Sequence, residues 1–97
     1  MTQTEMKYLI DSRKIAFEQL LSQSFEQIEI NKEKCFCVPS GVVITITPLY
    51  SVGALVIEYA DGLAEAETNT YEDGDLFFVE DYAETEMFHL MLQEINQ

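Results

Sequence analysis

A chain of 97 residues with 47% hydrophobic side chains is large enough for one core and too small for two, so we expect a single acidic α+β domain over residues 1–97. Its formal net charge of −13 disfavours direct contact with nucleic acid or an anionic membrane and favours a basic protein surface as partner. The longest uninterrupted apolar run, residues 52–57, is far shorter than the roughly twenty residues that span a bilayer. We therefore expect no membrane insertion.

The first expected element is a helix over about residues 3–24. Thr2 and Glu5 have the spacing of a capping box, in which two side chains satisfy free N–H groups at a helix start. Apolar residues then recur at steps of three, four and seven and form one stripe: Met6, Leu9, Ile10, Ala16, Phe17, Leu20, Leu21 and Phe25. On the opposite face, two pairs of residues four apart should form ion pairs: Lys7/Asp11 and Lys14/Glu18.

Three or four antiparallel strands should follow. Residues 35–38 form a short apolar run, and residues 42–47 alternate until Pro48, which donates no ladder hydrogen bond and should end the strand. Residues 54–60 and 63–70 flank Asp61-Gly62, a strong signal for a type I′ hairpin turn. That turn would place Glu58 opposite Glu65, and like charges in this position destabilise a sheet by about 0.2–1 kcal/mol.

The last quarter of the chain should contain a turn and a helix. Residues 72–75 are expected to turn, and the apolar run 76–79 is too short to assign to strand or helix. A final helix should begin near Asp81, with Glu84 in its first turn. The expected fold is thus α+β: a small antiparallel sheet of three or four strands with an N-terminal and a C-terminal helix packed on one face.

No pattern in the sequence indicates catalysis, a metal or a cofactor. Cys35 and Cys37 are one residue apart, which suits neither a disulfide nor a zinc site, and with no recognisable leader they favour a reduced, cytoplasmic setting. Residues 69–80 resemble a calcium loop but lack the usual ligands at its first and third places. His89 should be a solvated helix residue, because no nucleophile is spaced to join it. We expect a protein that is not an enzyme.

The functional hypothesis rests on the distribution of charge. All five basic residues lie in the first 34 positions, whereas residues 58–86 contain eleven acids and no base. Helix capping accounts for the later acids. The expected partner-binding surface therefore consists of Glu58, Glu65, Glu67, Glu72, Asp73 and Asp75. Candidate aromatic anchors beside it are Tyr71, Phe77 and Tyr82.

A row of carboxylates on a strand can occupy a basic groove that normally holds nucleic acid. In charge and order of elements, the chain resembles the acidic anti-CRISPR and anti-restriction DNA mimics of phages and mobile elements, although no residue motif supports the likeness. The resemblance implies an inhibitor of a nucleic-acid-binding protein. Two alternatives stay open: an immunity protein or antitoxin against a basic toxin, and a homo-oligomeric module, such as a homodimer, that buries the surplus apolar runs.

Overall fold

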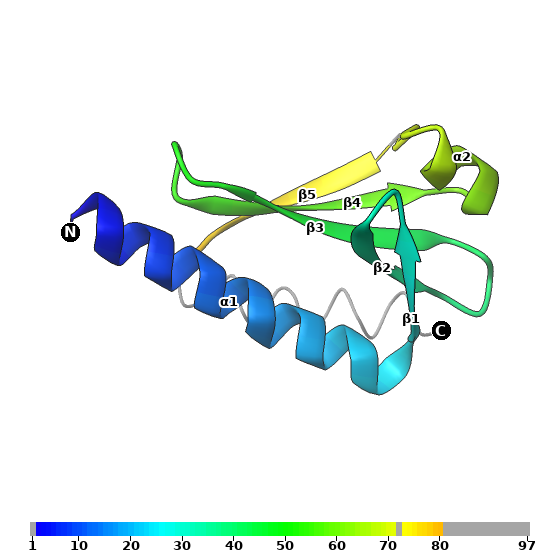
Figure 1. Ribbon diagram of the computed structural model, residues 1–97, viewed down its shortest axis with the longest axis horizontal. Helices are drawn as coiled ribbons and strands as arrows, with labels where there is room; N and C mark the ends of the chain where they lie inside the picture. Colours follow the sequence, from blue (N-terminus) through cyan, green and yellow to red (C-terminus); the bar gives the residue numbers. More distant parts are fainter. Residues whose placement is uncertain (1, 72, 81–97) are drawn as a thin grey trace.

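The computed structural model describes residues 2–71 and 73–80, and these form one long helix, a short helix and a five-stranded antiparallel sheet (Figure 1). The helix α1 spans Gln3–Ser24 and α2 spans Leu63–Glu67. The strands, in order along the sheet as well as the chain, are β1 (Glu26–Ile30), β2 (Glu33–Cys37), β3 (Val43–Leu49), β4 (Ala54–Ala60) and β5 (Asp73–Phe78). The α+β class is confirmed, with more strands than the three or four expected.

The first helix forms as its sequence predicts. The Thr2 hydroxyl accepts the Glu5 N–H at 3.1 Å and donates to the Glu5 carboxylate at 3.1 Å, which satisfies a free donor at the helix start. The expected ion pairs are present, Lys7/Asp11 at 3.1 Å and Lys14/Glu18 at 3.3 Å. The apolar stripe faces the sheet, where its buried members are Ile10, Phe17, Leu21 and Phe25.

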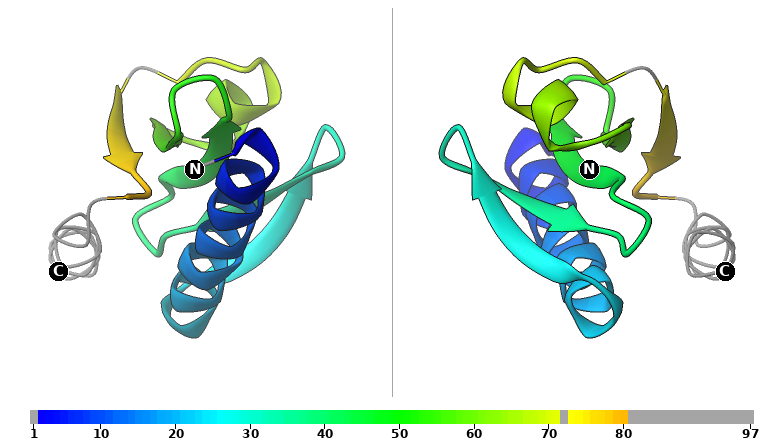
Figure 2. Two further views of the ribbon diagram at one scale, coloured as in Figure 1. Left: turned by 90° about the vertical axis from the view of Figure 1, so that its left-hand side faces the viewer. Right: turned by 90° about the vertical axis from the view of Figure 1, so that its right-hand side faces the viewer.

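Each face of the sheet has its own apolar cluster, because side chains alternate along a strand. One face, here called the α1 face, packs against α1 and contributes Phe36, Val38, Ile44, Ile46, Leu55, Ile57, Phe77 and Val79. The opposite face, here called the α2 face, is partly covered by α2 through Ala66, which clusters with Ile30, Cys35, Val43 and Ala60. Figure 2 shows β5 at one side of the sheet and the β1–β2 hairpin at the other.

The strand β1 was not predicted, because its turn lacks a strong sequence signal. Asn31 and Lys32 both adopt positive φ, 52° and 67°, in a two-residue hairpin turn between β1 and β2. Asn tolerates this conformation, but Lys at the second place is an uncommon choice. The Asn31 amide donates to the Glu67 carbonyl oxygen at 3.2 Å and so ties the turn to α2.

Pro48 does not end β3, which continues to Leu49. Pro48 stands opposite Leu55 of β4, but on the other side β3 pairs with β2 only as far as Thr45. At position 48, β3 has a neighbouring strand on one side only. When the backbone nitrogen of Pro48 faces the other side, its lack of an N–H removes no hydrogen bond between strands, and sheets tolerate proline at such positions. Residues 50–53 then connect β3 to β4, and β4 spans the expected residues.

The predicted hairpin at Asp61-Gly62 is wrong. Gly62 has extended backbone angles, φ −168° and ψ −178°, and precedes the helix α2 in place of a strand. Ala64 and Ala66 favour a helix, and Ala66 is buried against the α2 face. Glu58 consequently faces Thr45 of β3 and Gly74 of β5, so the expected opposition of Glu58 and Glu65 does not occur.

Residues 73–75 are likewise not a turn. Asp73–Phe78 pairs with β4 along its length, and the run 76–79 is strand as far as Phe78. The predicted final helix, with His89, lies outside the described residues.

The Gly62→Ala variant distinguishes α2 from the predicted hairpin. At the observed extended backbone, Ala should leave the free energy of unfolding unchanged or raise it by about 0.4–1 kcal/mol, because it restricts the unfolded chain. Its Cβ would lie 3.0 Å from a carboxylate oxygen of Glu65, the free end of a flexible side chain that can move away. In a type I′ turn the same change would force Ala to positive φ and cost about 1–2 kcal/mol. Urea unfolding followed by circular dichroism measures the difference, and a loss of that size would contradict the observed geometry.

Candidate functional site

Three of the predicted acidic residues lie together where β4 and β5 pair. We call Glu58, Asp73 and Asp75 the acidic edge. They line an open groove of about 370 Å³ together with Val56, Tyr71, Gly74 and Leu76. Its lining residues lie mainly on β4 and β5, and β5 is at the side of the sheet away from the β1–β2 hairpin (Figure 2).

The register of β4 and β5 positions these carboxylates on both faces of the sheet. Glu58 pairs with Gly74 and belongs to the α2 face, whereas Asp73 pairs with Tyr59 and belongs to the α1 face with Asp75. Gly74 carries no side chain and lines the groove next to Glu58. Both faces of the sheet therefore carry negative charge at or next to β5.

Tyr59 holds one of these carboxylates in place. Its hydroxyl donates to Asp75 Oδ2 at 3.0 Å, from a ring packed against the α1-face core. Burial raises the pKa of Tyr59, and the hydrogen bond to Asp75 and the charges of Asp75 and Asp73 raise it further. Tyr59 is therefore a neutral hydrogen-bond donor throughout the physiological range, and Asp75 has a fixed orientation.

Tyr71 is half-buried at the other side of the groove and packs against the α2-face cluster. Burial raises the pKa of its hydroxyl, and the neighbouring Cys35, Glu33 and Glu58 raise it further. Tyr71 thus contributes a partly covered aromatic wall beside Glu58.

The Tyr59→Phe variant should change how stability depends on pH. Below pH 10 we expect it to lower the free energy of unfolding by about 1 kcal/mol, through loss of the hydrogen bond to Asp75. The raised pKa means that folded Tyr59 keeps its proton where the unfolded chain has lost it. Above pH 10, the free energy of unfolding should therefore fall more steeply with pH for the wild type than for the variant. The difference in slope should be up to about 1.4 kcal/mol per pH unit. Urea unfolding at pH 8 and pH 11 tests this, and parallel pH profiles for the two proteins would contradict it.

The remaining predicted site residues are placed differently. Glu65 and Glu67 lie on α2, and the Glu65 carboxylate folds back towards Gly62 at the start of that helix. Phe77 is only 4% exposed and packs edge-on against Phe17, so it is a core residue and not an exposed anchor. Glu72 and Tyr82 lie outside the described residues.

Sequence reasoning missed the two exposed apolar residues of β5, Leu76 and Phe78, which are 44% and 45% exposed. They alternate with the buried Phe77 and lie on the α2 face opposite Val56 and Ala54. Residues 76–79 are all apolar, so no alternation in the sequence separated the exposed side chains from the buried ones, and the run was too short to assign to strand or helix.

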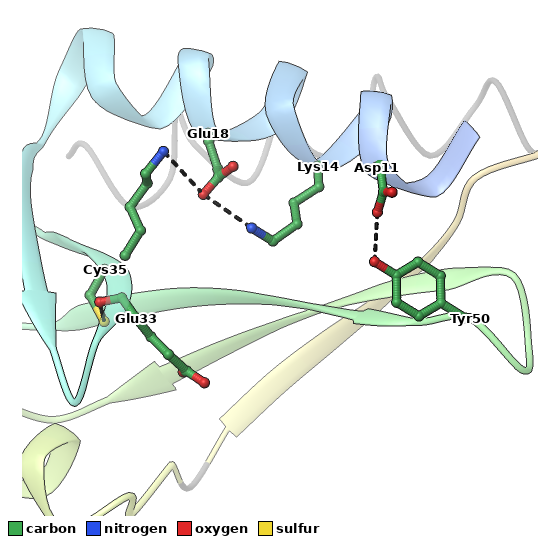
Figure 3. A network of polar contacts seen from close by, with 7 residues as sticks. Asp11, Lys14, Glu18, Glu33, Cys35 and Tyr50 are labelled. Carbon is green, nitrogen blue, oxygen red and sulfur yellow. Dashed lines mark hydrogen bonds and ion pairs between the residues drawn. The ribbon is translucent and has the colours of Figure 1, made fainter. Parts of the chain in front are cut away.

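The lysines with ion pairs lie elsewhere in the molecule. Lys7 pairs with Asp11, which also accepts the Tyr50 hydroxyl at 2.6 Å, and hydrogen bonding from Tyr50 and then Lys7 lowers the pKa of Asp11. Glu18 of α1 receives Lys14 at 3.3 Å and Lys34 of β2 at 3.8 Å (Figure 3). The contacts of Asp11 with Tyr50 and of Glu18 with Lys34 connect α1 to the sheet and the loop after β3, whereas the other two pairs lie within α1, and none of the four involves the acidic edge.

Within the described residues, no group of three or more His, Cys, Asp or Glu side chains is arranged to hold a metal ion. Over residues 2–71 and 73–80, no helix combines the length and hydropathy that a transmembrane segment requires. Comparisons with protein-family models, with curated proteins and with solved structures found no match.

Proposed function

We propose that this chain is a non-enzymatic acidic binding protein that captures the basic surface of a nucleic-acid-binding protein and inhibits it by taking the place of nucleic acid. The observation that supports this most directly is the acidic edge: the neighbouring strands β4 and β5 carry three carboxylates, Glu58 on the α2 face and Asp73 and Asp75 on the α1 face, and the ion-paired lysines lie elsewhere. These three carboxylates are not part of the two apolar clusters, and β4 and β5 are paired through their backbones, so most of the stability of the two strands should come from other groups.

The geometry suits this role in two ways. Asp73 and Asp75 occupy alternate positions on one strand, so they stand roughly 6.6 Å apart, a spacing of the same order as that of charges along a nucleic-acid backbone. The net charge of −13 should also speed encounter with a basic partner, and salt should weaken that effect. An immunity protein or antitoxin would use the same surface, and the identity of the captured protein separates these roles.

A second candidate function, a homo-oligomeric module, is favoured by the exposed apolar side chains of Leu76, Phe78 and Val52. Light scattering at about 0.5 M salt, where repulsion between the acidic copies is screened, tests it. A monomer under these conditions would exclude this second function.

The first function is tested by capture from a defined protein pool. The probe is the fraction of native cell lysate retained on heparin, which is rich in nucleic-acid-binding proteins. The triple variant E58Q/D73N/D75N should retain about tenfold less protein than the wild type at about 50 mM salt, and added DNA should displace what the wild type retains. The Asp75→Asn component keeps an oxygen that can accept the Tyr59 hydroxyl.

A matched control removes the same amount of charge elsewhere. Glu5, Glu26 and Glu29 are exposed on α1 and β1, so E5Q/E26Q/E29Q changes the net charge equally. It should keep most of the capture. Equal losses for the two triple variants would mean that only net charge matters and would contradict a role for the acidic edge.

A further inference from the structure

We propose that β5 accepts an additional strand from the partner, and that this strand alternates basic and apolar side chains. The inference rests on the proposed function and specifies how the basic partner is recognised. An extended segment that adds to a sheet edge gains affinity from backbone hydrogen bonds and specificity from its alternating side chains.

The position of β5 in the sheet makes such pairing available. Within the described residues, the strand order ends at β5, which pairs with β4 on one side only. Five of its six residues are exposed, the exception being Phe77. An edge strand of this kind presents a row of N–H and C=O groups that can pair with another strand.

The two faces of β5 carry different chemistry. On the α1 face are Asp73 and Asp75, whereas on the α2 face are Leu76 and Phe78, each about 45% exposed. An added strand continues both faces of the sheet. Its side chains on the α1 face would meet carboxylates and should be basic, and those on the α2 face would meet apolar groups and should be apolar.

The groove beside Gly74 extends from β5 onto β4. It is lined by Val56 of β4 and by Leu76 of β5, which are paired in the register of the two strands. An apolar side chain of the added strand would thus contact two strands of the sheet and not β5 alone.

Two other arrangements are less favourable. Pairing of β5 with a second copy of itself would bring together the acidic strands of two chains that each carry −13. The opposite edge, β1, exposes Glu26 and Glu29, but its apolar residues Ile28 and Ile30 are packed into the α2-face cluster. Among the strands of residues 2–71 and 73–80, β5 is therefore the edge strand that offers both an acidic and an exposed apolar row.

Synthetic peptides test the inference without knowledge of the natural partner. The probe is the blocked heptapeptide KVKVKVK, and the control KKVVVKK has the same composition and charge without the alternation. We expect the alternating peptide to bind about tenfold more tightly by calorimetry. Its binding should shift NMR signals of backbone amides in Asp73–Phe78 and leave those of Glu26–Ile30 unchanged.

Two modified reagents separate strand addition from simple charge attraction. Two further alternating peptides carry backbone N-methyl groups, one on its lysines and the other on its valines. The N–H groups of alternate residues point to the same edge of a strand, so only one of the two sets faces β5, and methylation of that set should abolish binding. The variant L76S/F78S keeps the net charge and alters only exposed side chains, and it should bind the alternating peptide more weakly.

Equal affinity for the two unmodified peptides, or shifts in β1, would overturn strand addition. So would β5 shifts that appear on concentrating the protein alone, because a second copy would then occupy the edge. The proposed function has a separate readout: it would stand if E58Q/D73N/D75N still lost capture of the heparin-retained proteins, and fail if capture were unaffected.

Discussion

Replacing Phe77 by Ala should lower the free energy of unfolding by about 3–5 kcal/mol, the usual loss when a buried aromatic side chain is truncated. Phe77 is 4% exposed, and its ring packs edge-on against Phe17 of α1, with centroids 5.8 Å apart and planes at 85°. The contact joins the edge strand to the long helix. Urea unfolding followed by circular dichroism measures the loss.

The neighbouring residue provides the control for this prediction. Phe78 has the same side chain on the same strand but faces the other side of the sheet and is 45% exposed. Phe78→Ala should therefore lower stability by about 1 kcal/mol or less. If the two variants lost equal amounts, the assignment of core and outer faces to β5 would be wrong.

The second large effect is expected at Gly53, where Ala should lower stability by about 2 kcal/mol. Gly53 adopts φ +70° in the connection between β3 and β4, a conformation that costs other residues about 1–2 kcal/mol. An added Cβ would also lie 3.2 Å from Met6 Sδ and 3.3 Å from Met6 Cε. The Gly53 carbonyl oxygen accepts the Val79 N–H at 3.1 Å, so a shift here would disturb the end of β5 as well.

Two variants separate strain from crowding at this position. Gly41 also has positive φ, +101°, but an added Cβ would meet no atom within 4 Å, so Gly41→Ala should report backbone strain alone. Met6→Ala combined with Gly53→Ala should recover part of the loss through removal of the close contact, a coupling that a double-mutant cycle detects. Purely additive losses would show that Met6 moves aside freely.

Long and strongly periodic segments were predicted correctly. The helix α1 has a cap, an apolar stripe and two ion pairs at helical spacing, and β4 is a seven-residue strand whose only charged residue is Glu58. Both are specified by local sequence. The short elements α2 and β1 were missed because their local signals are weak or misleading: Asp61-Gly62 matches a hairpin turn, and Lys32 does not suggest one. In each case packing on the α2 face outweighs local preference.

The strand β5 shows why the candidate site was only partly predictable. Asp73, Gly74 and Asp75 have the composition of a turn, yet an edge strand accepts them because their side chains need no burial. The residues of the acidic edge were thus identified by their charge; Glu58 was correctly expected in a strand, whereas Asp73 and Asp75 were expected in a turn and lie in β5. The register of β4 with β5 brings Tyr59 to Asp75 and places Glu58 opposite Gly74. No local pattern in the sequence specified that register.

The unequal pairing along the sheet has a consequence for its motions. Only three residue pairs join β2 to β3, against seven between β3 and β4 and six between β4 and β5. Few backbone bonds need to break for the β1–β2 hairpin to separate, so its amides should exchange with solvent through local opening, well before those of β3 and β4. The acidic edge lies on the more extensively paired side of the sheet, so a partner that binds there should lose less free energy to the ordering of the surface than one that binds the β1–β2 hairpin.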